Sequence, residues 1–229
     1  MNLKILIRRI ILFFKGSDLF VKNNIVVDYD ILGTEYGGWP VIPQLMNSDA
    51  IIYSAGVGED ISFDLALIDK YNVFIHAFDP TPSSIDYINN NINTKHFIMH
   101  NYGLYDKDCK MKFYLPRNKK YISHSIYDKG GEGAIEVNMR KITSIMDELG
   151  HTHIDLLKID IEGAEYDFIK DMIKNKIYPS QLLIEFHHRF KNLSPKMTKE
   201  ILFLLDEVGY GLYYVSDWGT DFGFIRKNI

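Results

Sequence analysis

The sequence contains almost no cysteine and no long uncharged apolar run. Cys109 is the only cysteine among 229 residues, which excludes a disulfide framework and a cysteine-based metal site. We therefore expect a reducing, cytoplasmic compartment. An excess of positive charge is also absent, since 26 Lys and Arg stand against 30 Asp and Glu for a formal net charge of −4. Broad nucleic-acid binding requires a basic face, so no nucleic-acid partner is expected.

The N-terminal residues 1–15 are apolar but interrupted by charge. Arg8 and Arg9 divide an apolar run that is too short to span a bilayer, and no signal-peptide cleavage pattern follows. We predict a helix that packs on the domain or on a second copy, as in a homodimer. The alternative is a basic amphipathic helix that lies on a membrane surface.

From residue 50 onwards, short apolar runs alternate with helical stretches, which is typical of a parallel α/β sheet. Strands are expected at 50–53, 73–78, 97–101, 110–115, 136–139, 154–159 and 181–185, and helices at 62–71, 83–91, 142–149, 164–174 and 194–208. Residues 211–215 and 222–226 are predicted to form an antiparallel pair. We expect one domain over 1–229, with a helical and covering segment at 1–49 and a Rossmann-like core at 50–229.

A glycine turn follows the first strand of this core. Gly56 and Gly58 allow a sharp turn and close approach of a ligand. A dinucleotide site usually has a third glycine three residues later, where this chain has Ile61. That absence disfavours NAD, whose pyrophosphate needs an open helix N-terminus. Adenosylmethionine has no phosphate, and its ammonium would suit a carboxylate such as Asp60.

Asp79 ends the second strand, about 20 residues beyond the glycine turn, where a carboxylate can accept both ribose hydroxyls of a nucleoside. Its alternative role is to cap the helix that follows. In such a fold Asn101 and Gly103, after the third strand, would pass beside the adenine, although a plain turn also explains them. These features together favour a nucleoside cofactor.

Acids and histidines follow the later strands, at the edge where open α/β sheets bind ligands. Transfer of a methyl group to oxygen requires removal of the hydroxyl proton. His187 is the favoured base because imidazole titrates near neutrality, and Asp160 could orient it or bind the acceptor. Asp160, Glu185 and His187, with Glu162 as a further ligand, could instead hold Mg²⁺ or Mn²⁺.

Purely structural roles remain open for the same residues. Asp160 and Glu162 could cap the helix after Gly163, and Glu185 could pair with Lys158, whose charge is costly in an apolar strand unless it is paired. In the polar loop before residue 136, Tyr121, His124 and Tyr127 could contact a sugar, or belong to a surface loop without that role.

The segments 36–39, 54–64, 77–82, 155–166 and 185–188 resemble the FkbM family of methyltransferases, and the run LLKIDIEGAE is the most specific match. The resemblance covers about 30–226. It implies a class I methyltransferase fold, with a mostly parallel seven-stranded sheet, a C-terminal antiparallel strand and helices on both faces. It also implies adenosylmethionine as cofactor. The expected cofactor contacts are Tyr36, Gly37, Gly38, Trp39, Ser54, Gly56, Gly58, Asp60, Asp79, Asn101, Gly103 and Asp160, and the expected acceptor side is Asp160, Glu162, Glu185 and His187.

The leading hypothesis is an O-methyltransferase that acts on a sugar, such as a nucleotide-sugar or a surface-polysaccharide precursor. The polar strand ends favour an acceptor rich in hydroxyls over a flat aromatic one. A nucleotide-dependent oxidoreductase or epimerase is disfavoured by the missing third glycine and by the short chain after the sheet. A non-catalytic nucleoside-binding protein is disfavoured by the acidic and histidine-bearing edge.

Overall fold

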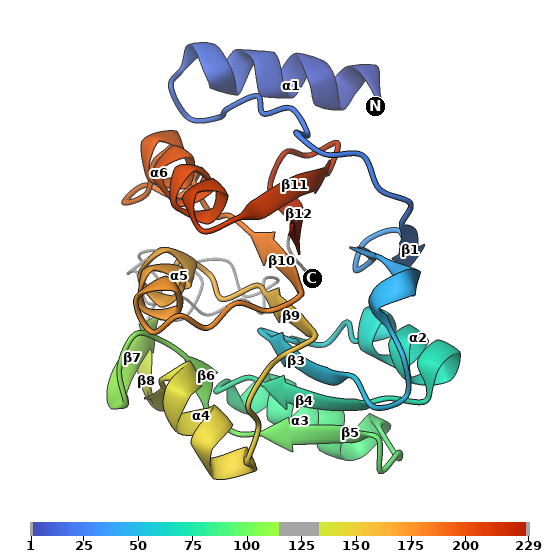
Figure 1. Ribbon diagram of the computed structural model, residues 1–229. Coiled ribbons are helices and arrows are strands. Elements are labelled where there is room, and N and C mark those ends of the chain that lie inside the picture. Colours follow the sequence, from blue (N-terminus) through green and yellow to red (C-terminus); the bar gives the residue numbers. More distant parts are fainter. Residues whose placement is uncertain (1, 115–132, 228–229) are drawn as a thin grey trace.

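The computed structural model describes residues 2–114 and 133–227, and a seven-stranded sheet forms its centre (Figure 1). The strand order is β11-β12-β10-β9-β3-β4-β5. The strands are β3 (Ile51–Ala55), β4 (Phe74–Phe78), β5 (Phe97–His100), β9 (Leu156–Ile159), β10 (Gln181–Glu185), β11 (Tyr210–Val215) and β12 (Asp221–Arg226).

Only the last strand runs against the others. β3 pairs in parallel with β4 and β9, and the parallel pairing continues to β5 on one side and β10 on the other. β12 is inserted between β10 and β11 and is antiparallel to both. This order, with the final strand placed between the fifth and the sixth, is that of the class I methyltransferase sheet. The predicted fold class and the predicted C-terminal antiparallel pair are confirmed.

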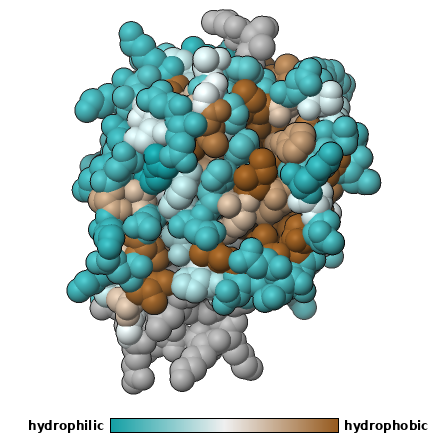
Figure 2. Space-filling view, turned by 90° about the horizontal axis from the view of Figure 1, so that it is seen from below, coloured by the Kyte–Doolittle hydropathy of each residue, from teal (hydrophilic) through white to brown (hydrophobic). Residues whose placement is uncertain are grey.

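Helices cover both faces of the sheet because its central strands are apolar on both faces. On one face Ile52 and Ile75 pack with α2 (Ser62–Tyr71) and α3 (Pro82–Asn91). On the other face Tyr53 and Phe78 pack with α4 (Ile142–Leu149), α5 (Glu165–Lys174) and α6 (Pro195–Glu207). Seen from below, apolar side chains gather towards the middle of the surface and hydrophilic ones surround them (Figure 2).

The helix boundaries agree with the predicted ones to within one residue, and local chemistry explains their ends. Asn72 and Gly150 adopt left-handed backbone conformations after α2 and α4, the usual way to end a helix. Pro195 takes the first position of α6, where its missing N–H costs nothing. Ser194 stands at the N-cap of α6 as expected, but its side chain makes no capping hydrogen bond.

The N-terminal part consists of α1 (Leu3–Phe14) and a two-stranded antiparallel sheet, β1 (Asp30–Leu32) with β2 (Trp39–Val41), followed by a 3₁₀ turn at Pro43–Leu45. The predicted helix in residues 1–15 is confirmed from Leu3 onwards. No described helix has both the length and the apolarity needed to cross a membrane. The division at residue 49 and the single-domain organisation stay predictions.

A small second sheet completes the fold. It joins β6 (Gly103–Leu104), β8 (Ala134–Arg140) and β7 (Cys109–Tyr114). The two expected short strands at 110–115 and 136–139 correspond to β7 and β8, which pair antiparallel. Tyr121, His124 and Tyr127 lie outside the described residues.

Three histidines form a cluster against the β3–β4–β5 part of the sheet. His76 Nδ1 lies 3.1 Å from His100 Nε2, and the hydroxyl of Tyr53 lies 2.8 Å from Nδ1 of His151. Burial, followed by the neighbouring His100 and His151, lowers the pKa of His76 to about 4. The neutral form of His76 is therefore the one that the folded protein accommodates.

This cluster predicts that the protein loses stability in mild acid. Because the pKa of His76 is depressed on folding, the unfolded chain binds more protons between about pH 6.5 and 4. The contribution of neutral His76 to the free energy of unfolding is complete above pH 6.5 and is lost as the pH falls towards 4. With allowance for its partial exposure, this loss is about 1–2 kcal/mol. Denaturant titrations at several pH values should show this slope, and His76→Gln should flatten it. An unchanged slope in the variant would contradict the assignment.

Candidate active site

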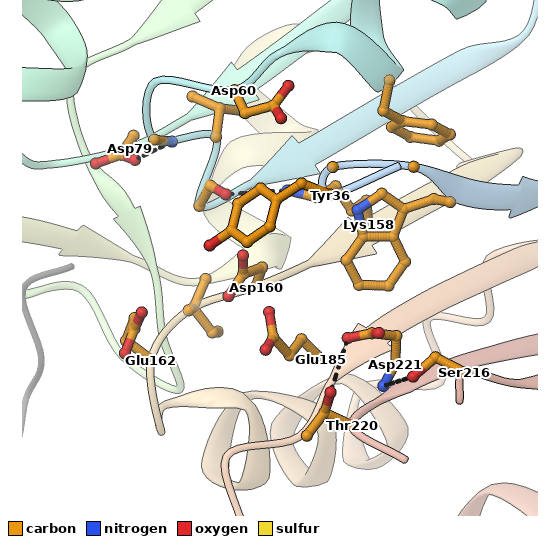
Figure 3. A pocket seen from close by; sticks show the side chains of 18 of the residues that line it. Tyr36, Asp60, Asp79, Lys158, Asp160, Glu162, Glu185, Ser216, Thr220 and Asp221 are labelled. Atoms are coloured by element: carbon orange, nitrogen blue, oxygen red, sulfur yellow. Dashed lines mark hydrogen bonds between the residues drawn. The ribbon is translucent and has the colours of Figure 1, made fainter. Parts of the chain in front are cut away.

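The carboxyl ends of the central strands open on a cavity of about 1170 Å³ (Figure 3). It is continuous from the glycine turn after β3 to the acidic ends of β9, β10 and β12. Most of the residues predicted for the cofactor and acceptor sides line it: Tyr36, Gly37, Gly38, Trp39, Gly56, Gly58, Asp60, Asp79, Gly103, Asp160, Glu162 and Glu185. The sheet topology thus brings the two predicted halves of the site together.

Gly56 and Gly58 of the turn differ in what surrounds the position of a side chain. Both have positive φ, 72° at Gly56 and 55° at Gly58. A Cβ on Gly56 would lie 1.6 Å from the backbone oxygen of Asp160, so this glycine permits the close packing of the β3 and β9 ends. A Cβ on Gly58 would meet no atom within 4 Å. Gly58, which lines the cavity, is therefore the better candidate for close approach to a ligand.

Asp79 is held in one orientation at the end of β4. Its Oδ2 accepts a hydrogen bond of 3.0 Å from the Gly58 N–H, and its Oδ1 accepts from both the N–H and the hydroxyl of Thr81. The N-cap of α3 is Thr81 rather than Asp79, and its side chain makes no capping hydrogen bond, so Asp79 contacts the start of this helix only through Thr81. The same carboxylate lines the cavity, and its Oδ2, which accepts only one of these bonds, has a second lone pair for a ligand.

The covering segment (residues 1–49) reaches the cavity at Tyr36 and contacts Asp60 of the glycine turn through Thr34. Asp60 accepts hydrogen bonds from the Thr34 hydroxyl and the Ser62 N–H, both at 3.0 Å. Burial alone would raise its pKa, but these bonds to Ser62 and Thr34 lower it overall, so Asp60 is ionised at neutral pH. Figure 3 shows the Tyr36 side chain crossing the pocket between Asp60 and Asp160.

Lys158 in β9 has a different partner from the one expected. Its ammonium donates to the backbone oxygen of Gly56 at 2.9 Å and lies 5.6 Å from the centre of the Trp39 ring. Among the described residues it forms no ion pair with Glu185, so that structural alternative is wrong. Lys158 instead ties the glycine turn to β9.

A row of carboxylates crosses the other end of the cavity. Register places Glu185 opposite Asp221 on β12, and the pairing of Ile184 with Ile159 places it beside Asp160 (Figure 3). Burial, and then repulsion by Asp160, raises the pKa of Glu185 well above its usual value. The pKa of Asp160 is also raised, chiefly by burial. Such a pair binds a proton more readily than an isolated carboxylate does, and its ionised member can take a proton from an acceptor.

His187 lies behind this row rather than in the cavity wall. Its side chain is buried, its backbone N–H donates to Glu165 Oε1 at 2.8 Å, and its Nδ1 lies 3.3 Å from the same oxygen. Burial lowers its pKa, but Glu165, Glu162 and Glu185 outweigh burial and raise the pKa well above its usual value. An imidazole that already carries its proton is a poor base, so the geometry disfavours the role that the sequence suggested.

Glu165 and Asp221 were missed as site residues, and two predicted cofactor residues do not line the cavity. Ser54 is completely buried within β3, and Asn101 is exposed beyond the end of β5. The N-cap of α5 is Ala164, whose side chain makes no capping hydrogen bond, and the alternative that Asp160 and Glu162 cap this helix stays a prediction. Glu165 instead accepts from the Gly163 N–H at 2.8 Å, and its place inside LLKIDIEGAE was the available signal.

The set Asp160, Glu185 and His187 also has the spacing of a cation site. One ligand atom from each lies within 4.8 Å of the others. Two carboxylates and one imidazole suit Mg²⁺ or Mn²⁺ better than softer metals. The arrangement is compatible with an ion, and His187 Nε2 also lies 3.7 Å from Asp160 Oδ1 without one.

The model of the family described as "Methyltransferase FkbM domain" matches residues 55–212, which include both halves of the cavity. The chain belongs to the FkbM methyltransferase family. The match runs from the last residue of β3 into β11 and therefore covers the glycine turn and the parallel strands β4, β5, β9 and β10.

The individual proteins that the chain resembles share limited sequence identity with it. "Probable methyltransferase-like protein 24" of Homo sapiens is 27% identical over 147 residues, which cover 63% of this chain and 34% of the relative. Its Rattus norvegicus counterpart is 40% identical over 52 residues, 22% of this chain and 14% of the relative. A solved FkbM methyltransferase from Methylobacillus flagellatus has a TM-score of 0.48 at 14% identity, covering 79% of this chain and 44% of that one. The chain thus spans about a third or less of the curated relatives that it matches.

Proposed function

We propose that this FkbM-family chain uses adenosylmethionine to methylate a hydroxyl group of a sugar, such as a nucleotide-sugar or a surface-polysaccharide precursor. One observation carries the proposal. A single cavity joins a nucleoside-type half, made by Gly58 and Asp79, to an acid pair, Asp160 and Glu185, at the ends of adjacent strands.

The residues of the first half fit adenosylmethionine. Asp79 is fixed at the strand end where a carboxylate can accept ribose hydroxyls. The ionised Asp60 and the carboxyl of Asp160 offer negative charge for the ammonium and sulfonium groups of this molecule. When bound, adenosylmethionine supplies an electrophilic methyl carbon, and the chain does not have to activate the methyl group itself.

The residues of the second half fit an acceptor hydroxyl. Glu185 lines the cavity and can accept the hydroxyl proton as the new carbon–oxygen bond forms and the carbon–sulfur bond breaks. Asp160 binds and orients the acceptor beside it. The buried His187 imidazolium, held by Glu165, offsets the charge of the neighbouring carboxylates, so we place it as a positioning residue rather than as the base.

The acceptor class is tested by a screen. The protein is incubated with labelled adenosylmethionine and a panel of nucleotide-sugars and polysaccharide precursors, and products are read by mass. We expect one sugar to gain a single methyl group on oxygen. A methyl group found on nitrogen or carbon of the preferred acceptor would contradict the proposed chemistry.

Metal removal distinguishes two roles for the carboxylates at the acceptor end: proton transfer from the acceptor, or binding of a cation. We expect turnover to survive exhaustive EDTA treatment at the level of an untreated sample, because the His187 imidazolium already lies beside the carboxylates of Asp160 and Glu162. Activity is measured with labelled adenosylmethionine before and after chelation. A loss of tenfold or more that Mg²⁺ or Mn²⁺ restores would instead assign Asp160, Glu185 and His187 to a required cation.

A further inference from the structure

The helix α1 carries an exposed apolar stripe that no described part of the chain covers. Its outward side chains recur at the spacing of one helix face and are between 40% and 83% exposed. They are Leu3, Ile7, Ile10, Ile11 and Phe14. α1 lies at one end of the molecule, outside the layers of the sheet (Figure 1). Five large apolar residues on one exposed face are more than a soluble surface helix needs.

The opposite face of α1 is anchored to the protein by a charge. Arg9 is the one buried residue of the helix, and its Nε lies 3.3 Å from the fully buried carboxylate of Asp18. Its guanidinium also donates to the backbone oxygens of Leu19 and Asp217. The usual polarity of a surface helix is thus reversed, with a charged contact inside and apolar side chains outside. The apolar stripe cannot turn inward without breaking a buried ion pair.

Basic side chains flank the stripe along one side. Lys4, Arg8 and Lys15 follow one another at helical spacing and are exposed, and within the described residues none of them has an acidic partner. Residues 1–15 contain four basic and no acidic side chains, in a chain whose net charge is −4. The Arg8 guanidinium lies 5.5 Å from the ring centre of the half-exposed Trp218, and tryptophan is favoured at membrane interfaces.

We propose that α1 is a peripheral membrane anchor, which lays its apolar stripe into the surface of an anionic bilayer while Lys4, Arg8 and Lys15 contact the headgroups. The flanking charge selects this occupant. A second copy packed on the same stripe would bring these cations towards their own symmetry mates, whereas an anionic surface neutralises them. The proposal concerns binding alone and does not depend on methyl transfer.

Docking in this way would bring the cavity to the membrane. Ile5 of α1 and Asn2, the N-cap of this helix, line the cavity together with Trp218 and Arg189. Arg189 lies 2.6 Å from the Asp18 carboxylate that also pairs with Arg9. One buried ion network therefore joins the anchor to the acceptor end of the site. An acceptor carried by a lipid would therefore be presented beside the acid row.

The test is co-flotation of the intact protein with vesicles of phosphatidylcholine, with and without phosphatidylglycerol. We expect binding to the anionic vesicles that added salt weakens. The double variant Ile7→Glu/Ile11→Glu should abolish it, and Lys4→Gln and Lys15→Gln should each weaken it about fivefold. The control Leu65→Glu places a glutamate on an exposed apolar residue of α2, away from α1 (Figure 1), and should bind as the native protein does.

Two results would overturn the proposal. One is that the native protein binds neither vesicle, or binds both equally. The other is that it sediments as a dimer that Ile7→Glu/Ile11→Glu dissociates, which would assign the stripe to a second copy. Circular dichroism of each variant checks folding, and the changes are at exposed positions, so the native spectrum is expected.

Discussion

Replacing Glu185 by glutamine lowers kcat by a factor of about 10²–10⁴, the usual contribution of a positioned general base. The amide keeps the size of the side chain but cannot take the hydroxyl proton. Adenosylmethionine binding is retained, because Glu185 lies at the acceptor end of the cavity and Asp79 at the other. Single-turnover kinetics with labelled adenosylmethionine, together with calorimetry, measure both quantities.

The pH profile of the same reaction gives an independent readout. Activity should rise with pH as Glu185 loses its proton, and the rise should occur well above the usual range of a glutamate because burial and Asp160 raise its pKa. If His187 is a positioning residue, His187→Gln should shift this pH profile. If His187 were the base, the same variant should lose activity at every pH. If Glu185→Gln keeps full turnover while His187→Gln abolishes it, the base is His187 and our assignment is wrong.

Removing the carboxylate of Asp18 destabilises the fold by about 3–5 kcal/mol, the cost of leaving buried charges without their partner. Asp18 is fully buried among Arg9, Arg189 and His188. Burial raises its pKa, but His188, whose Nε2 lies 3.4 Å away, and Arg189, which donates a hydrogen bond at 2.6 Å, outweigh burial and lower the pKa to about 2. Denaturant unfolding of Asp18→Ala measures the loss.

The control for this prediction is a carboxylate without such partners. Asp28 is exposed in the same N-terminal part of the chain, so Asp28→Ala should change the free energy of unfolding by less than about 0.5 kcal/mol. A similarly small effect of Asp18→Ala would mean that α1 is not fixed by this network.

Much of the fold could be predicted because its signals are local. Apolar runs such as Leu182–Ile184 form strands that are buried on both faces, and the glycine turn marks the passage from β3 to α2. The carboxyl ends of parallel strands share one edge, so Asp79, Asp160 and Glu185 could be assigned to one site without knowledge of their contacts. All three residues line the same cavity.

The remaining features depend on contacts between distant segments. Sequence alone does not give the register of β12 on β10, which adds Asp221 to the acid row. It also does not reveal that Glu165 reaches His187, 22 residues away, and keeps its proton in place. The ordinary pKa of histidine favoured His187 as a base, and only the three-dimensional surroundings reverse that preference. The anchoring of α1 through Arg9 and Asp18 is similarly a tertiary feature.

Calorimetric titration with adenosylmethionine and, separately, with NAD tests the central claim most directly. We expect adenosylmethionine to bind and NAD not to bind. Asp79→Asn, which keeps an oxygen for Thr81 but loses the charge, should weaken adenosylmethionine binding at least about tenfold, the effect of losing one charged hydrogen bond. Asp147→Asn, at an exposed position on α4, should leave binding unchanged. Tight binding of NAD, with none of adenosylmethionine, would contradict the proposed function.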